Sequence, residues 1–268
     1  MKSVLLHINQ DPGQESRLAA AVEIVRANQG RLSCLQASPL DAFMFTGDPY
    51  GAVYFSSDLF ETLRESEKLE RVRIEALLEI EGIDWEWLHV QETAPRAIIE
   101  HAKLVDLVVL SQPEHEKTLL APLAADVAVH VRSPTLVVPI SNKSFDYGGT
   151  AMIAWNGSSE SAHAVRLSLS LLRAASVVRV VQVNEDDEHG TSAAVLRYLA
   201  QHGIEAEAHQ HPRGDASVGS ALIEAAADLE AGYIVLGAYG HSRVRETVLG
   251  GVTQDLIFGS PVPLVLAH

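Results

Sequence analysis

Glycines recur at fixed intervals near the end of the chain, directly after an apolar stretch. Residues 234–236 are apolar, Gly237 follows them, Gly240 comes after two more residues and Gly250 after a further nine. Glycine lets the backbone approach a ligand closely, and backbone N–H groups at a helix start bind anions such as phosphate. Since residues 252–258 have helical apolar periodicity, this loop is suited to hold the phosphates of a nucleotide.

The spacing Gly-x2-Gly-x9-Gly followed by Gly251, Val252 and Thr253 resembles the ATP-binding loop of the universal stress protein family. In that family the same spacing precedes Ser or Thr. The phrase Ala154-Trp155-Asn156-Gly157-Ser158 lies where the family ends its first strand with Val-Asp-Gly-Ser. The resemblance covers nearly the whole chain as two copies, one intact and one eroded. It implies a nucleotide-responsive stress or signalling protein with ATP, with or without Mg²⁺, as its cofactor.

Carried over position by position, the resemblance implies a nucleotide-binding set made of Ala154, Trp155, Asn156, Val183, Gly237, Gly240, Arg243, Gly250, Gly251, Val252 and Thr253. Two of these depart from the family pattern. Asn156 replaces an Asp, so it can hydrogen-bond a ribose or base but brings no charge for a metal. Gly251 replaces a hydroxyl residue. Trp155 either crowds the base or stacks on it, and Val183 lies where the family packs adenine.

Purely structural roles are open to several of these residues as well. The glycines also suit tight turns that bind nothing, and Thr253 also suits a helix cap. Arg243 and the nearby Arg245 either clamp phosphates or remain solvated. Asp215 most simply begins a helix.

The elements that would position this set alternate between strands and helices. In the C-terminal half, strands are expected near residues 150–155, 177–183, 204–209, 232–237 and 263–267, and helices near 159–174, 190–202, 215–231 and 247–259. Strands of continuous Val, Leu and Ile between helices are typical of parallel strands buried on both faces. Such sheets bind ligands at the carboxyl ends of their strands, which would bring Asn156 and Gly237 together.

The chain contains this unit twice. Residues 106–111 match 232–237, residues 133–138 match 260–266, and residues 4–9 match 151–156. The predicted fold is therefore α/β, with two tandem doubly wound domains that each hold a mostly parallel five-stranded sheet flanked by helices. Residues 1–140 form a degenerate domain, 141–149 a polar linker, and 150–268 the domain with the glycine loop. Family members associate through the last strand, here 262–266, which implies an internal pseudo-dimer and leaves a further homodimer open.

The N-terminal copy lacks the glycine apparatus. Residues 111–117 supply a proline and two glutamates where the glycines would stand, and these repel phosphate and remove a donor. We therefore expect residues 1–140 to bind no nucleotide through this loop. Aromatic residues instead crowd into 43–60, just before a long helix expected near 58–81. This aromatic segment is either a flap on its own domain or a dimer contact or ligand lid.

Composition narrows the function classes. The net charge of −15 divides into −9 for residues 1–140 and −6 for 141–268, which argues against nucleic acid and anionic membranes as partners. No apolar run is long enough to span a membrane, and the first residues predict a strand instead of a signal peptide, so a cytoplasmic location is expected. The single cysteine, Cys34, is expected to be buried. Twelve histidines form no recognisable metal set, although His7 and His130 are expected near the sheet.

Three functions fit these observations. The first is a tandem universal stress protein in which ATP shifts a conformational or assembly equilibrium. No nucleophile–base pair is evident, so no catalytic residue is assigned and any hydrolysis should be slow. The second is an ATP-dependent enzyme of related architecture, which the absence of an acidic pair near the loop disfavours. The third is a nucleotide-free interaction protein, towards which Trp155, Asn156 and Gly251 point.

Overall fold

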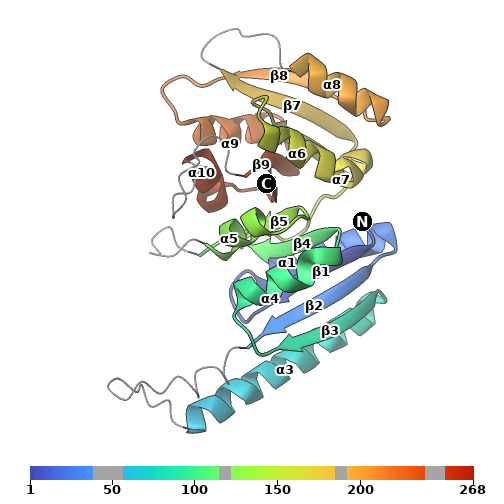
Figure 1. Ribbon diagram of the computed structural model, residues 1–268, viewed down its shortest axis with the longest axis vertical. Coiled ribbons are helices and arrows are strands. Elements are labelled where there is room, and N and C mark those ends of the chain that lie inside the picture. The colour runs from blue at the N-terminus through green and yellow to red at the C-terminus, as the bar shows by residue number, and fades with distance from the viewer. Residues whose placement is uncertain (39–56, 115–121, 185–191, 239–250) are drawn as a thin grey trace.

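The computed structural model describes residues 1–38, 57–114, 122–184, 192–238 and 251–268. Within these ranges, ten strands form one continuous sheet in the order β3-β2-β1-β4-β5-β10-β9-β6-β7-β8 (Figure 1). Neighbouring strands are parallel except β5 and β10, which run antiparallel where the two halves meet. The strands are β1 Ser3–Ile8, β2 Arg31–Ala37, β3 Asp84–Val90, β4 Leu107–Ser111, β5 Thr135–Val138, β6 Thr150–Ala154, β7 Val177–Asn184, β8 Glu207–Pro212, β9 Tyr233–Gly237 and β10 Leu264–Ala267.

The two halves repeat one topology. Each places its first strand between its second and fourth, and the registers agree: Val4 pairs with Leu107, and Ala151 pairs with Tyr233. The predicted fold class of two tandem doubly wound domains is therefore confirmed. The last strands of the halves pair with each other, Val265 opposite Leu136, so the internal pseudo-dimeric arrangement is built from β5 and β10.

Helices cover both faces of the sheet. Side chains of β1 show the division, because Val4 and Leu6 join one apolar cluster and Leu5 joins the other. The first face carries α1 Gln14–Asn28, α3 Ser57–Glu81, α6 Ser159–Leu167, α7 Leu169–Ala174 and α8 Ser192–Gln201. The second carries α4 Ala94–His101, the short 3-10 helix η1 Ala102–Leu104, α5 Leu123–His130, α9 Val218–Asp228 and α10 Gly251–Gly259.

Most predicted elements lie where the sequence placed them, with four differences. Helix α9 begins at Val218 with Ser217 as its N-cap, so Asp215 does not begin it. The expected helix 159–174 is divided at Ser168, whose φ of −92° and ψ of 5° leave the helical range. The last strand before α9 begins at Glu207 and not near 204, because Gly203, at φ 73°, and Ile204 still close the end of α8. His130 lies at the exposed end of α5 and not near the sheet.

The segment predicted as a polar linker is packed against both halves. The Phe145 side chain is 2% exposed, and its ring centroid lies 5.5 Å from that of Tyr233. The Phe145 N–H donates to the Glu23 carboxylate at 2.9 Å. Phe145 thus makes the segment 141–149 part of the hydrophobic core instead of a solvent-exposed linker. The domain boundaries themselves stay a prediction.

Two further observations concern the predicted class of protein. Cys34 is fully buried, as predicted, and burial raises the pKa of its thiol to about 12. In the described segments, no helix has both the length and the apolar composition needed to cross a lipid bilayer.

Candidate functional site

The carboxyl edge of β6 and β9 is the candidate site. The two strands are adjacent and parallel, with Ile153 opposite Val235, so Asn156 and Gly237 follow or end them at one edge of the sheet. Because α10 connects β9 to the parallel strand β10, it runs opposite to both, and its first residue, Gly251, lies at the same edge. The chain leaves β6 towards β7 on one side and returns to β9 on the other, so the strand order reverses at this point. Doubly wound sheets bind ligands at such a point.

The loop after β6 is a capped turn. The Asn156 side-chain oxygen accepts a hydrogen bond from the Ser158 N–H at 3.1 Å, and Gly157 has a φ of 75°. The Ser158 hydroxyl then accepts from the Ser161 N–H at 3.1 Å and begins α6. Asn156 itself is exposed at the edge. Its observed role is therefore to shape the turn that presents the start of α6.

The residues expected around the base divide between the two faces of the sheet. Ala154 and Val183 are half-buried on the α9 and α10 face. The Trp155 ring is half-buried on the opposite face, and its buried indole N–H has no hydrogen-bond partner among the residues that the structure describes. The structure thus brings Ala154 and Val183 to one side of the sheet and places Trp155 away from them.

The glycine loop is described only at its two ends. A side chain at Gly237 would bring a Cβ to 2.5 Å from the Glu160 carbonyl carbon and 2.6 Å from the Ser161 nitrogen, so this glycine lets α6 approach β9. A Cβ at Gly251 would meet none of the described residues within 4 Å. In the same first turn of α10, Val252 is 36% exposed and Thr253 is 4% exposed. Gly240, Arg243, Arg245 and Gly250 lie outside the described residues, as does most of the aromatic segment 43–60.

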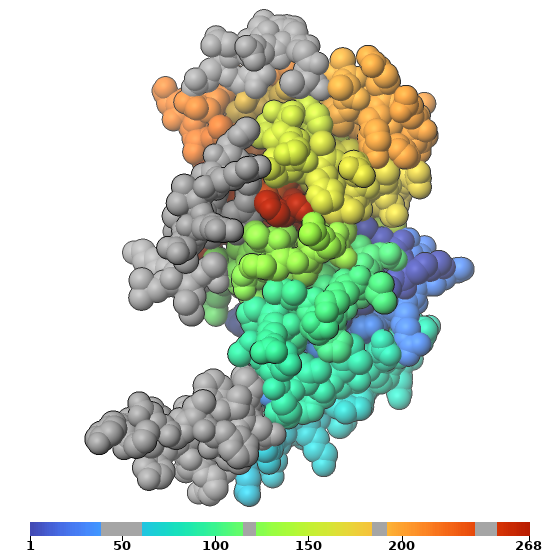
Figure 2. All heavy atoms as spheres, in the orientation of Figure 1, coloured from blue at the N-terminus to red at the C-terminus, as the bar shows by residue number. Residues whose placement is uncertain are grey.

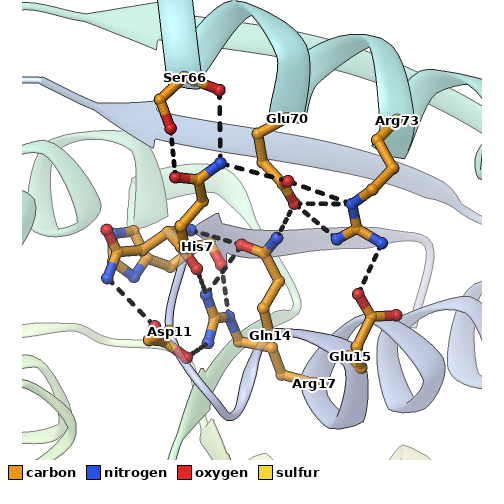
Figure 3. Close-up of polar contacts among 10 residues, drawn as sticks. His7, Asp11, Gln14, Glu15, Arg17, Ser66, Glu70 and Arg73 are labelled. Carbon is orange, nitrogen blue, oxygen red and sulfur yellow. Dashed lines mark hydrogen bonds and ion pairs between the residues drawn. The ribbon is translucent and has the colours of Figure 1, made fainter. Parts of the chain in front are cut away.

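The equivalent edge of the N-terminal half holds a buried cation. The Arg17 side chain is 1% exposed and donates to the backbone oxygens of His7 at 2.7 Å and Asn9 at 2.6 Å. It also pairs with the Asp11 carboxylate at 2.5 Å (Figure 3), and it donates to the Ser111 hydroxyl at 2.8 Å. Burial lowers the pKa of the Arg17 guanidinium, and the hydrogen bond and charge of Asp11 oppose that shift. The cation ties the carboxyl end of β1 to that of β4.

A chain of polar side chains connects Arg17 to α3. Gln14 accepts from Arg17 at 3.2 Å and donates to the Glu70 carboxylate (Figure 3). Arg73 pairs with Glu70 at 2.6 Å and with Glu15 at 2.7 Å. The hydrogen bond from Arg73 is the main cause that lowers the pKa of Glu70. These charged side chains are paired with one another, so the cluster has a structural role and few of its charges are available to bind a ligand.

His7 adds a neutral group under this edge. It is 7% exposed on β1, and burial together with the charge of Arg17 lowers its pKa to about 4, against an opposing contribution from Asp11. The imidazole is therefore uncharged at neutral pH.

The two edges solve the same packing problem in opposite ways. In the N-terminal half the end of β4 carries Ser111, and the helix start opposite it is Gly13, where a Cβ would lie 2.6 Å from the Ser111 Cβ. In the C-terminal half the strand end is Gly237 and the helix start carries Glu160. Four residues after each of these helix-start positions stands Arg17 in one half and the buried Ala164 in the other. No arginine therefore fills the C-terminal edge from this helix position.

Sequence reasoning missed the Arg17 cluster. The signal was an arginine on α1 between Ser16 and Leu18, both of which are also buried. A charged residue on the inward side of a helix normally has a buried partner. Its charged partner, Asp11, is only six residues away, but the Ser111 hydroxyl, to which Arg17 also donates, is distant in sequence, so the link to β4 could not be found from local spacing. In the described part of the chain, no three His, Cys, Asp or Glu side chains gather closely enough to hold a metal ion.

Comparison with known proteins supports the fold. No protein-family model and no curated protein sequence matches the chain. Among solved structures, a universal stress protein from Archaeoglobus fulgidus matches with a TM-score of 0.71 and 16% identity, covering 99% of this chain and 96% of that one. A functionally unknown protein from Pseudomonas aeruginosa matches with a TM-score of 0.59 and 14% identity, covering 100% of this chain and 92% of that one. A candidate universal stress protein from Pseudomonas aeruginosa matches with a TM-score of 0.57 and 13% identity, covering 99% and 93%. The chain thus has the fold of universal stress proteins along its whole length, as the sequence predicted.

Proposed function

We propose that this chain is a tandem universal stress protein that binds an adenine nucleotide, with ATP as the leading choice, at the carboxyl edge of β6 and β9. The observation that carries the proposal is the start of α10. Among the described residues, nothing lies within 4 Å of where a Gly251 side chain would project, at the edge where β6 and β9 end. A helix start with room beside it is where a phosphate chain binds most readily.

The phosphates would lie against the first turn of α10. The backbone N–H groups of a helix start and the positive end of its dipole attract an anion. Gly240, Arg243 and Gly250 belong to this phosphate site on the family spacing, and Val252 and Thr253 complete the turn. Mg²⁺ would be held mainly by the phosphates, because Asn156 supplies an amide oxygen and no charge.

The base would lie towards Val183 and Ala154, which share the face that α9 and α10 cover. Asn156, exposed at the end of β6, would hydrogen-bond the ribose. Trp155 takes no part in this arrangement, because its ring packs on the other face of the sheet. The specificity for adenine would therefore come from apolar contact with few polar groups.

Only one site is proposed per chain. At the N-terminal edge the Arg17 guanidinium is already paired with Asp11 and bonded to two backbone oxygens. Pro113 and Glu114 follow β4 where glycines follow β9. We expect the bound nucleotide to shift a conformational or assembly equilibrium in a stress response, with slow turnover at most.

Calorimetric titration of ATP with Mg²⁺ tests the proposal. Gly251→Asp should abolish binding, because it adds a negative charge beside the phosphates in a position that the fold tolerates. Gly251→Ala, the matched control, adds a methyl group without charge and should keep binding within a few-fold. ADP, AMP and adenosine, titrated in turn, should bind progressively more weakly as phosphates are lost.

Saturable binding of one nucleotide per chain that is lost only in Gly251→Asp would support the proposal. No wild-type binding at millimolar ATP would overturn it and favour the nucleotide-free interaction protein, the function to which the turn role of Asn156 and the packed Trp155 ring point. Equal affinity for adenosine and ATP would contradict the phosphate site at α10.

A further inference from the structure

Helix α3 has a second apolar face that nothing in the described chain covers. Its inner face packs on the sheet through Ile74 and Leu78, each 0% exposed. On its outer side Leu69 is 71% exposed, Val72 57% and Ile80 83%. Large apolar residues at such exposure along one helix are uncommon on a monomer surface and indicate an interaction site.

These outer residues form one continuous stripe. At 3.6 residues per turn, the positions of Leu69, Val72, Ala76 and Ile80 fall on one side of α3, nearly opposite Ile74 and Leu78. Ala76 is also exposed. Spacings of three and four residues are those of a helix that packs lengthwise against another helix. We call this set the α3 stripe.

Two charged residues flank the α3 stripe on the same side. Lys68 and Glu79 are exposed and lie about three helical turns apart. Within the described residues neither side chain has an ion pair, whereas nearby Arg71 pairs with Glu75 at 2.7 Å. If a second α3 packs antiparallel on the stripe, Lys68 of each copy comes opposite Glu79 of the other. In a parallel twofold pair the two charged flanks would lie on opposite sides of the interface and form no such ion pairs.

The position of α3 leaves room for such a partner. The sheet has only two outer strands, β3 and β8, because β5 and β10 already pair inside the chain. Helix α3 leads directly into β3 and lies at the end of the molecule away from the C-terminal half (Figures 1 and 2). A second chain can therefore approach it without disturbing the rest of the fold.

We infer that the protein forms a twofold homodimer in which the α3 stripes of two copies pack antiparallel. Leu69 of one copy lies opposite Ile80 of the other, Val72 lies near Ala76, and two Lys68–Glu79 ion pairs close one flank. The interface is isologous, as a twofold axis requires, and it is separate from the nucleotide edge of β6 and β9.

Sedimentation velocity over a range of concentrations tests this dimer. Wild type should sediment as a dimer, and a Leu69→Glu, Ile80→Glu double variant as a monomer with an unchanged far-UV circular dichroism spectrum. Leu104→Glu is the matched control, since Leu104 is 92% exposed on η1, outside the stripe, and should leave the dimer intact. A monomeric wild type, or a dimer that survives the double substitution, would overturn the inference.

Two further variants test the orientation. Lys68→Glu or Glu79→Lys alone should raise the dimer dissociation constant about tenfold, because attraction becomes repulsion on the flank, and the charge-swapped double variant should restore it. Leu69→Cys mixed with Ile80→Cys should form a disulfide under oxidation, while Leu69→Cys alone should not. Self-linking of Leu69→Cys would show a parallel pair instead. Cys34 cannot compete, since it is buried.

Discussion

Replacing Arg17 with methionine is the sharpest test of what holds the N-terminal half together. Methionine has a similar reach and is apolar, so it can fill the space of the side chain while removing every donor. The substitution removes the Arg17 donor from the oxygens of His7, Asn9 and Ser111, and it removes the cation from Asp11.

The cost follows from these contacts. Removing one partner of a buried ion pair costs about 3–5 kcal/mol. The Asp11 carboxylate is 30% exposed, so water can replace part of its interaction and the ion-pair share lies at the lower end of that range. The backbone oxygens of His7 and Asn9 each lose a charge-assisted hydrogen bond, which adds a further cost that is not additive with the first. We expect a loss of about 4 kcal/mol in the free energy of unfolding.

Urea unfolding followed by tryptophan fluorescence measures this loss. Trp85 and Trp87 lie on β3 in the affected half, and Trp155 lies in the other half, so a Trp155→Phe background isolates the N-terminal signal. Arg166→Met is the matched control, because Arg166 is an exposed arginine on α6, the equivalent helix of the other half. It should change stability by less than about 0.5 kcal/mol.

A loss below about 1 kcal/mol for Arg17→Met would refute the assignment of Arg17 as the cation that ties β1 to β4. A second variant separates charge from packing. Adding Asp11→Asn to Arg17→Met removes the unpaired carboxylate and should recover at least about 1 kcal/mol of the loss. If the double variant is less stable than the single one, the unpaired Asp11 carboxylate is not the cause of the lost stability.

Two more predictions concern titration and glycine packing. The pKa of His7 is lowered from 6.5 to about 4 in the folded protein, so its contribution to stability is present above pH 6.5 and is lost as the pH falls through 4. We expect urea unfolding of the wild type to show a decline of about 3 kcal/mol over this window, and His7→Gln to lack that component. A His7→Gln profile parallel to that of the wild type would show that His7 does not titrate in this window. Gly237→Ala should cost about 1–3 kcal/mol, because its Cβ would press on the backbone of Glu160 and Ser161. Gly251→Ala should instead gain up to about 1 kcal/mol, and thermal unfolding of the two variants that gave equal shifts would contradict the difference in packing.

The central strands could be predicted from sequence because their environment is uniform. β4 and β9 are buried on both faces and carry continuous apolar residues, so local composition alone identifies them. The edge strand β8 alternates between exposed and buried positions and contains Glu207, His209 and His211, which gave no apolar run to mark its start. The start of β8 is therefore determined by where α8 ends, and Gly203, with its positive φ, marks that end.

The candidate site could be predicted only where spacing along the chain determines it. The meeting of Asn156 and Gly237 follows from the order of strands, and the structure places both at one edge. The reason for Gly237 could not be predicted, because its close neighbour Glu160 lies on a distant helix. The face on which Trp155 packs does follow from spacing, because Trp155 continues the alternation of Ala151 and Ile153 along β6, whereas Ala154 faces the other side.

The two carboxyl edges show how a duplicated fold can keep its architecture while its halves diverge. At the edge of β1 and β4 the space above the strands is bridged by Arg17, a positive charge supplied from within, whose partner Asp11 is part of the same chain. At the edge of β6 and β9 the equivalent helix position holds Ala164, which supplies no charge, and among the described residues nothing lies within 4 Å of the Cβ position of Gly251 at the start of α10. A ligand that binds there is therefore expected to be an anion, since a helix start favours negative charge. If the N-terminal half were instead the binding half, a nucleotide would have to displace Arg17, which is 1% exposed and donates to two backbone oxygens. Binding of the nucleotide phosphates could not offset that cost, because Asp11 and Glu70 repel them.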